Sequence, residues 1–219
     1  KEGRTLSPEQ ARTLLLAAEG DRLEAFVSVA LACGLRRGEA LGLSWSDVDL
    51  DDATLTVRRT LQRLRGGLVF GEPKTRGSRR RLELPASSVA ALRAHKARQA
   101  QERLKVGAAW QDAGLVFTTA IGTPLDPDNV RRYFSRLTTA AGLGHWTPHE
   151  LRHSAASLLL AQGLPLEVVS EVLGHSSIRI TKDVYGHLQR PQLRRAADAM
   201  DALLAPGDSH PDSQAERLR

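Results

Sequence analysis

The stretch TPHELRHSAASLLLAQG, residues 147–163, decides how this chain folds. Thr147 is a helix-capping residue and Pro148 suits a first turn, so the stretch predicts a helix over about 148–162. Its 3.6-residue period places His149 and Arg152 together near the helix N-terminus. The neighbouring face is apolar and consists of Leu151, Ala155, Leu158 and Leu159. An imidazole and a guanidinium beside a positive helix end favour an anion such as a phosphate, although the same pair could cap a neighbouring carboxylate.

The same residues, from His149 to His153, also spell H-E-x-x-H, the pattern of zinc proteases. Arg152 disfavours a zinc site because it would place a fixed positive charge beside the dication. The longer form of the pattern requires a glycine and a histidine where Ala156 and Leu159 stand. No second motif supplies a third ligand, so the sequence predicts no metal site.

The composition is that of a globular protein with a basic surplus. Of 219 residues, 41% are hydrophobic and 26% are charged, which excludes a fibrous or mostly disordered chain. The net charge is +6, and the excess of arginine over lysine favours phosphate binding or reflects a GC-rich genome. Cys33, the one cysteine, lies in an apolar run and is expected in the core. The sequence lacks a signal peptide and a run long enough to span a membrane, so we expect a cytoplasmic protein.

The periodicity outside that helix predicts a mainly helical fold with a small three-stranded antiparallel β-sheet. Further helices are expected from Pro8, over about 22–33, from Arg37, and over about 86–104, 127–141, 165–173, 178–187 and 190–204. Three short runs between residues 54 and 85, separated by glycine-containing turns, predict one antiparallel meander. Residues 1–204 are expected to form a single domain, and residues 205–219 a disordered tail.

The predicted meander is strongly basic. From Arg58 to Arg81 the chain carries nine basic residues and one acid, Glu72. A solvated face normally mixes charges, so this density indicates a polyanion as partner. Lys74 lies at the start of a turn, from which its ammonium could reach into a groove.

A second polar group lies further along the chain. His175 follows Gly174 in a predicted turn between two short helices, and Tyr185 comes ten residues later in a polar helix end. The helices predicted over 165–173 and 178–187 could instead form a helix-turn-helix that enters the DNA major groove.

Six polar residues can be combined into one reaction: Arg36, Lys74, His149, Arg152, His175 and Tyr185. Two arginines can clamp the non-bridging oxygens of a phosphodiester by paired, charge-assisted bonds. Only about a thousandth of a tyrosine is phenolate at neutral pH, so a tyrosine nucleophile needs a base or a positive field. A histidine can supply the base, the arginines the field, and a lysine the proton for the leaving 5′ oxygen. The combination predicts phosphoryl transfer without a metal ion.

Four blocks, in this order, resemble the catalytic domain of the tyrosine recombinases, the phage integrase family. They are GLRRGEALGLSWSDVDL, EPKTRGSRRRLELP, TPHELRHSAASLLLAQG and VSEVLGHSSIRITKDVYGHL, and the resemblance spans about residues 5–200. It implies the tyrosine recombinase catalytic domain fold and assigns the roles one by one. Arg36 and Arg152 match the arginine clamp, Lys74 the general acid, His149 and His175 the catalytic histidines, Tyr185 the nucleophile, and Glu39 a supporting acid.

The resemblance also implies a partner and a reaction. The chain is expected to be a site-specific recombinase or integrase that forms a 3′-phosphotyrosyl bond with double-stranded DNA, without a cofactor, as a tetramer on DNA and a monomer alone. The residues expected to contact DNA are Arg58, Arg59, Arg76, Arg79, Arg80, Arg179 and Lys182. The alternatives are a type IB topoisomerase and a non-catalytic DNA-binding module. Most members carry a further N-terminal core-binding domain, so we expect the chain to be a fragment.

Overall fold

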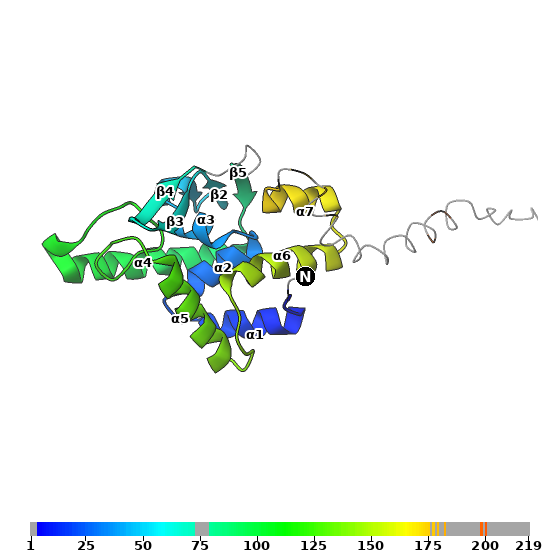
Figure 1. Cartoon of the computed structure of the whole chain (residues 1–219), viewed down its shortest axis with the longest axis horizontal. Coiled ribbons are helices and arrows are strands. Elements are labelled where there is room, and N and C mark those ends of the chain that lie inside the picture. Colours follow the sequence, from blue (N-terminus) through cyan, green and yellow to red (C-terminus); the bar gives the residue numbers. More distant parts are fainter. Residues whose placement is uncertain are drawn as a thin grey trace, which may run out of the picture.

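The computed structural model describes residues 4–72 and 79–175, and beyond these only the isolated residues 177, 179, 182, 198 and 200. Within these residues the chain is mainly helical, with its strands gathered on one side of the helices (Figure 1). Apart from those isolated positions, the helices expected over 178–187 and 190–204 and the tail 205–219 lie outside the described residues.

The helices begin where the capping residues predict. α1 (Pro8–Ala18) follows Ser7, whose hydroxyl accepts the N–H of Gln10, and α5 (Pro127–Ala140) follows Asp126. α6 (Pro148–Ala161) follows Thr147, whose N–H donates to the carboxylate of Glu150. The other helices of the described part are α2 (Glu24–Ala32), α3 (Arg37–Leu41), α4 (Ala86–Val106) and α7 (Leu166–Leu173), with 3₁₀ turns at Trp45–Asp47 and Gly107–Ala109. These bounds confirm the helices predicted for this part of the chain.

The strands pair differently from the predicted meander. The three-stranded sheet has the order β1 (Val48–Asp49), β2 (Thr54–Val57), β5 (Arg80–Glu83), and both pairings are antiparallel. β3 (Thr60–Leu64) and β4 (Gly67–Gly71) form a separate hairpin. The small three-stranded antiparallel sheet is confirmed, but the prediction of one continuous meander is wrong. The run over 54–64 is broken at residues 58–59, so β2 joins the sheet and β3 joins the hairpin.

Helix α2 forms the centre of the core. Its residues Ala25–Leu31 are all buried because α1, α4 and α6 pack around it (Figure 1). Phe26 meets Phe117 edge to face, with ring centroids 5.6 Å apart, and burying a side chain of this size contributes about 1.5–3 kcal/mol. Cys33 is buried at the end of the helix, and burial raises the pKa of its thiol to about 12, as expected for a core residue. The rigid α2 therefore fixes the chain that follows it, residues 34–39.

Two glycines let α3 lie directly on β3. A Cβ at Gly38 would stand 2.8 Å from the carbonyl oxygen of Leu61, and one at Gly42 would stand 2.8 Å from that of Arg59. Both neighbours are backbone atoms that cannot rotate away, so a side chain at either glycine would push the helix off the strand. This close approach holds the first turn of α3, which carries Glu39, against the hairpin.

Helix α7 packs on α6 through a second apolar cluster, which consists of Ala156, Leu160, Leu166, Val169 and Leu173. It ends at Gly174, whose φ of 65° lies in the left-handed region that glycine adopts without strain. This turn directs the chain to His175. No helix in the described part of the chain is both long and apolar enough to cross a membrane.

Candidate active site

The buried carboxylate of Glu39 organises the start of α3. Glu39 is 1% exposed, and its Oε1 accepts from Nη1 of Arg36 at 2.6 Å while its Oε2 accepts the backbone N–H of Arg36 at 3.0 Å. Burial by itself would raise the pKa of Glu39, but the charges and hydrogen bonds of Arg80 and Arg36 outweigh it and hold that pKa below its usual value. The carboxylate therefore stays ionised and fixes the guanidinium of Arg36.

Arg80 is a second arginine on the same carboxylate. Its Nη2 donates to Oε2 of Glu39 at 3.0 Å, its Nε donates to the carbonyl oxygen of Val172 at 2.7 Å, and its side chain is 5% exposed. The expectation that Arg80 contacts DNA from the surface is therefore corrected. Successive side chains of a strand alternate between its faces, and β5 turns Arg80 inward while Arg81 faces solvent.

Arg152 reaches this region from α6. The residue is 4% exposed, and its Nη1 donates to the carbonyl oxygen of Gly34 at 2.8 Å. Gly34 has a φ of 58° and stands two residues before Arg36 in the chain. The bond therefore ties the second predicted clamp arginine to the segment that carries the first.

The imidazoles of His149 and His175 lie close to these arginines. Burial lowers the pKa of His175 to about 4, and the charges of Arg152, Arg36 and Arg80 contribute to this shift. Burial is also the main cause that lowers the pKa of His149, and its positive neighbours lower that pKa further. Both rings are therefore neutral at pH 7, in the form that can accept a proton.

His149 and His153 meet edge to face, with ring centroids 4.9 Å apart, as expected for residues one turn apart on α6. Over the residues that the structure describes, no group of three histidine, cysteine or acidic side chains could hold a metal ion. Glu150, the base of the zinc-protease pattern, instead accepts the N–H of Thr147 at 2.7 Å and caps the helix. The H-E-x-x-H match is thus explained by helix capping.

These contacts gather residues from separate parts of the chain into one group, which we call the arginine cluster: Arg36, Glu39, Arg80, His149, Arg152 and His175. Three guanidiniums and one carboxylate leave an excess of positive charge beside two neutral imidazoles. Such a group can bind the non-bridging oxygens of a phosphodiester and accept a proton from an attacking hydroxyl. Lys74, Arg76 and Tyr185 lie outside the described residues, so their predicted roles stay predictions.

A model of the phage integrase family matches residues 4–191, a range that includes the whole arginine cluster. The chain belongs to the phage integrase family. An integrase of Streptomyces ambofaciens is 40% identical over 216 residues, which cover 93% of this chain and 54% of the relative. A XerC-like tyrosine recombinase of Caldanaerobacter subterraneus is 34% identical over 211 residues, which cover 91% of this chain and 54% of that protein. This integrase-family chain therefore spans about half the length of these curated relatives.

Solved structures show the same fold. The crystal structure of XerA recombinase matches this integrase-family chain with a TM-score of 0.69 at 28% identity, covering 94% of this chain and 66% of that one. The Tn1549 transposon integrase in complex with transposon right end DNA matches with a TM-score of 0.75 at 24% identity, covering 91% of this chain and 66% of that one. The expected tyrosine recombinase catalytic fold is confirmed.

Acidic residues from other parts of this integrase-family chain neutralise much of its basic stretch, Arg58 to Arg81. Seven of its nine basic residues are described, and five of these form ion pairs: Arg58 with Asp47, Arg63 with Asp126, Arg79 with Glu72, Arg80 with Glu39, and Arg81 with Asp52. Four of the five acids come from outside the stretch, so a count along the sequence misses them. Arg58 and Arg79 keep more than half of their side-chain surface exposed. Arg179 and Lys182, also expected on DNA, are exposed.

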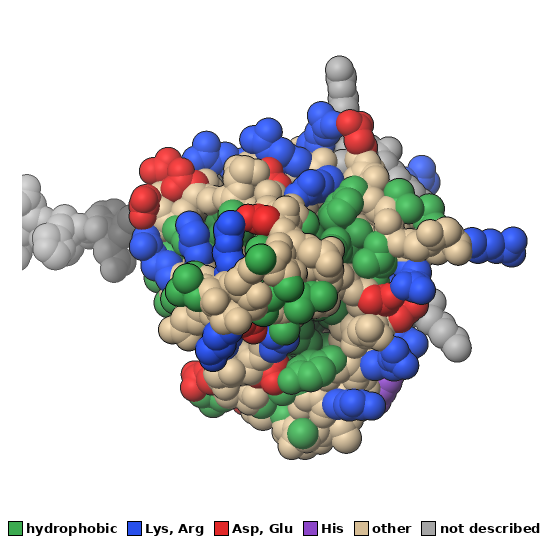
Figure 2. All heavy atoms as spheres, turned by 90° about the vertical axis from the view of Figure 1, so that its left-hand side faces the viewer, with side chains coloured by type: hydrophobic (Ala, Val, Ile, Leu, Met, Phe, Trp, Pro, Cys, Tyr) green, Lys and Arg blue, Asp and Glu red, His purple; other side chains and the backbone are tan. Residues whose placement is uncertain are grey.

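The hairpin of β3 and β4 presents apolar as well as basic side chains. Leu64, Val69 and Phe70 are exposed, and the guanidinium of Arg59 lies 4.9 Å from the ring centroid of Phe70 while its Nε donates to the carbonyl oxygen of Gly42. Figure 2 shows a mixed surface on the side of the molecule at the left of Figure 1, with hydrophobic side chains near the middle and lysines and arginines toward the margin. The surface of this integrase-family chain is therefore amphipathic around the hairpin rather than uniformly basic.

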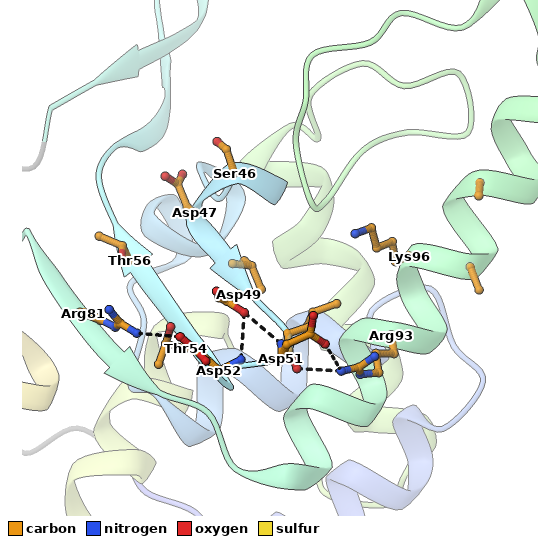
Figure 3. A pocket seen from close by; sticks show the side chains of 14 residues that line it. Ser46, Asp47, Asp49, Asp51, Asp52, Thr54, Thr56, Arg81, Arg93 and Lys96 are labelled. Atoms are coloured by element: carbon orange, nitrogen blue, oxygen red, sulfur yellow. Dashed lines mark hydrogen bonds and ion pairs between the residues drawn. The ribbon is translucent and has the colours of Figure 1, made fainter.

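A hollow of about 860 Å³ beside β1, β2 and α4 is lined by four aspartates and by Arg81, Arg93 and Lys96, and it shares no lining residue with the arginine cluster (Figure 3). Asp51 pairs with Arg93 and Asp52 with Arg81. These carboxylates offset the basic side chains, so the hollow offers a phosphodiester less positive charge than the arginine cluster does. A cleft of about 370 Å³ between α3 and β3 is lined by Arg36, Arg37 and Arg63 and adjoins the cluster directly.

The free energy of unfolding of this integrase-family chain is expected to fall as the pH drops below about 6.5. His175 has a pKa of about 4 in the folded chain and an ordinary value of 6.5 when unfolded, so the unfolded state takes up the proton first. The contribution of His175 is fully present above pH 6.5 and is lost between pH 6.5 and 4. Urea denaturation at pH 7 and pH 5 should show a smaller fall for His175→Gln than for the wild type. Equal falls would contradict the assignment.

Proposed function

We propose that this chain is the strand-transfer domain of a site-specific DNA recombinase, formed by residues 1–204. The observation that carries the proposal is the arginine cluster, in which Glu39 holds Arg36 and Arg80 while Arg152 is tied to Gly34. Two of its three guanidinium side chains, Arg80 and Arg152, are buried, whereas that of Arg36 is 40% exposed, so the cluster holds an excess of positive charge that an anion can reach. Double-stranded DNA supplies that anion, and the relatives named recombinase and integrase support the choice.

In the proposed reaction the phenol oxygen of Tyr185 attacks a phosphorus atom of the DNA backbone. A new oxygen–phosphorus bond forms as a 3′-phosphotyrosyl ester, and the bond to the 5′ oxygen breaks. Arg36 and Arg152 bind the non-bridging oxygens and stabilise the charge that develops on them. A neutral histidine of the cluster accepts the phenol proton, and Lys74 protonates the leaving 5′ oxygen. A 5′ hydroxyl of a second duplex then reverses the step, so the ester bond energy is conserved.

The same proposal includes the assembly and the remaining DNA contacts. Exchange between two duplexes needs four cleavages, so we propose a tetramer on DNA that forms from monomers. Arg58, Arg59, Arg76, Arg79, Arg179 and Lys182 are proposed to contact the backbone around the cleaved phosphate. Binding through such contacts falls steeply with salt, because each one releases a counterion.

The test is capture of the covalent intermediate. The chain is incubated with nicked duplexes of randomised sequence, the mixture is denatured, and protein-linked strands are recovered and sequenced. We expect an adduct with the wild type that survives EDTA, and none with Tyr185→Phe. The matched control is Tyr133→Phe, because the chain has two tyrosines and Tyr133 is 45% exposed with its hydroxyl on Asp21.

Three other outcomes would overturn parts of the proposal. An adduct that persists in Tyr185→Phe would show that another residue is the nucleophile. DNA binding without any adduct would favour a non-catalytic binding module. Relaxation of supercoiled plasmid without strand exchange between two selected duplexes would favour a topoisomerase.

A further inference from the structure

Arg80 has no part in the proposed reaction steps, yet it is one of the most buried charges described. Its side chain is 5% exposed, whereas those of its neighbours Arg79 and Arg81 are 58% and 63% exposed. Removing a guanidinium from water is costly, and buried ion pairs often contribute little net stability compared with apolar residues of the same size. A need for stability alone therefore explains the burial of Arg80 poorly.

The contacts of Arg80 join two parts of the arginine cluster. Nη2 donates to Glu39, and the other oxygen of that carboxylate accepts from Arg36. Nε donates to the carbonyl oxygen of Val172, three residues before His175 in the last turn of α7. Arg80 is also the first residue of β5, so it anchors the strand directly after the segment that contains Lys74. One guanidinium thus connects the start of α3, next to Arg36, with the end of α7, next to His175, from the first residue of β5.

We infer that Arg80 is a positioning residue for strand cleavage: through Glu39 it aims the guanidinium of Arg36, and through Val172 it sets the turn that carries His175. The inference rests on the proposed function, because cleavage is the reaction for which these groups are positioned. The planar guanidinium is suited to the task because it donates in two directions at a fixed angle, which a lysine ammonium on a flexible stem does not. Arg80 is not proposed to touch DNA.

The test compares Arg80→Met and Arg80→Lys with two controls, the wild type and the matched variant Arg81→Met. Both Met substitutions remove one positive charge from β5, but only Arg80→Met removes the internal contacts. The probe is the nicked duplex that the wild-type chain selects, and the measurements are duplex affinity by fluorescence anisotropy and the single-turnover rate of adduct formation at saturating DNA. Urea denaturation gives the folded fraction of each variant at the assay temperature.

We expect Arg80→Met to slow adduct formation by about 100-fold, the effect of misplacing catalytic groups by roughly 1 Å. Its DNA affinity should stay within about threefold of the controls, since a buried side chain contributes little to counterion release. Arg80→Lys should keep the fold and recover part of the rate, because an ammonium can reach one of the two acceptors. A rate within threefold of the controls would overturn the inference, as would a rate loss that merely follows the unfolded fraction or a matching loss of affinity.

A second readout needs no DNA. The imidazole of His175 is surrounded by the charges of Arg36, Arg80, Arg152 and Glu39, so its titration by NMR reports on their arrangement. We expect the pKa of His175 to rise in Arg80→Met and to be unchanged in Arg81→Met. If the wild type forms no adduct while this shift is seen, the proposed function fails and the internal linkage stands. If the wild type forms the adduct and Arg80→Met neither slows it nor shifts His175, the positioning role fails and the function stands.

Discussion

The Arg152→Lys variant is expected to form the covalent DNA adduct about a thousandfold more slowly than the wild type, because it loses the prearranged guanidinium that we propose as a donor to the phosphate oxygens. Arg152 is 4% exposed and donates through Nη1 to the carbonyl oxygen of Gly34. A guanidinium has five N–H donors in a planar fork, so it can donate to a phosphate while one of its nitrogens stays bonded to Gly34. A lysine keeps the positive charge but offers a single point of contact on a flexible stem, so it cannot serve the anchor and the phosphate together.

The comparison for this variant is Arg131→Lys, an equal change at an exposed position of α5. Rates are measured by quenched single turnovers at saturating duplex, so that differences in affinity do not contribute. Arg131→Lys should react within about threefold of the wild type, as surface changes of this kind have small effects. If Arg152→Lys reacts within tenfold of the wild type, its guanidinium does not clamp the phosphate.

The second large effect is expected in stability. Glu39→Gln should lower the free energy of unfolding by about 3 kcal/mol, because it leaves the guanidinium of Arg80 buried beside an uncharged amide. Glu39 is 1% exposed and Arg80 is 5% exposed in this pair, so water does not compensate for the lost charge. For a chain of this size the melting temperature should fall by roughly 6–12 °C. Thermal and urea denaturation measure both quantities.

Two further variants test whether this loss of stability comes from the Glu39–Arg80 ion pair. Glu83→Gln is an equal change at an exposed position of β5 and should alter stability by less than about 0.5 kcal/mol. A Glu39→Met, Arg80→Met double variant should be more stable than either single Met variant, because it removes both charges from the core. Strictly additive losses in this cycle would show that the two side chains do not interact.

Much of the fold follows from local signals. The pairs Ser7-Pro8 and Thr147-Pro148 placed the starts of α1 and α6 correctly, and Asp126 caps α5 before Pro127 in the same way. The pairing of the strands could not be predicted in the same way. No local signal indicates that the run over 54–64 divides at residues 58–59. The division occurs where Arg59 and β3 pack on Gly42 and Gly38, which lie outside the run.

The candidate site shows the same limit. Its residues could be chosen by type and spacing, and Arg36, Arg152, His149 and His175 do lie close together in the structure. The roles that the resemblance to the family assigned to them stay predictions. Arg80 was misjudged because its neighbours Arg79 and Arg81 suggest a basic surface. A signal was nonetheless present, since a strand alternates its faces and Arg80 stands in phase with the buried Leu82. Its partners, Glu39 and the carbonyl of Val172, lie 41 and 92 positions away in the chain and leave no local trace.

The bond between Arg152 and Gly34 joins positions 118 residues apart, and this has a consequence for the order of folding. Contacts that close such long loops are made only after the chain entropy of the loop has been lost, so they form late. On the ribosome, Arg36 emerges 116 residues before Arg152, so the two cannot meet until that stretch has been synthesised. Local helices can form before then, whereas the anion site cannot. A nascent or truncated chain therefore has helices without the arginine cluster, and the proposed strand cleavage becomes possible only once the cluster is assembled.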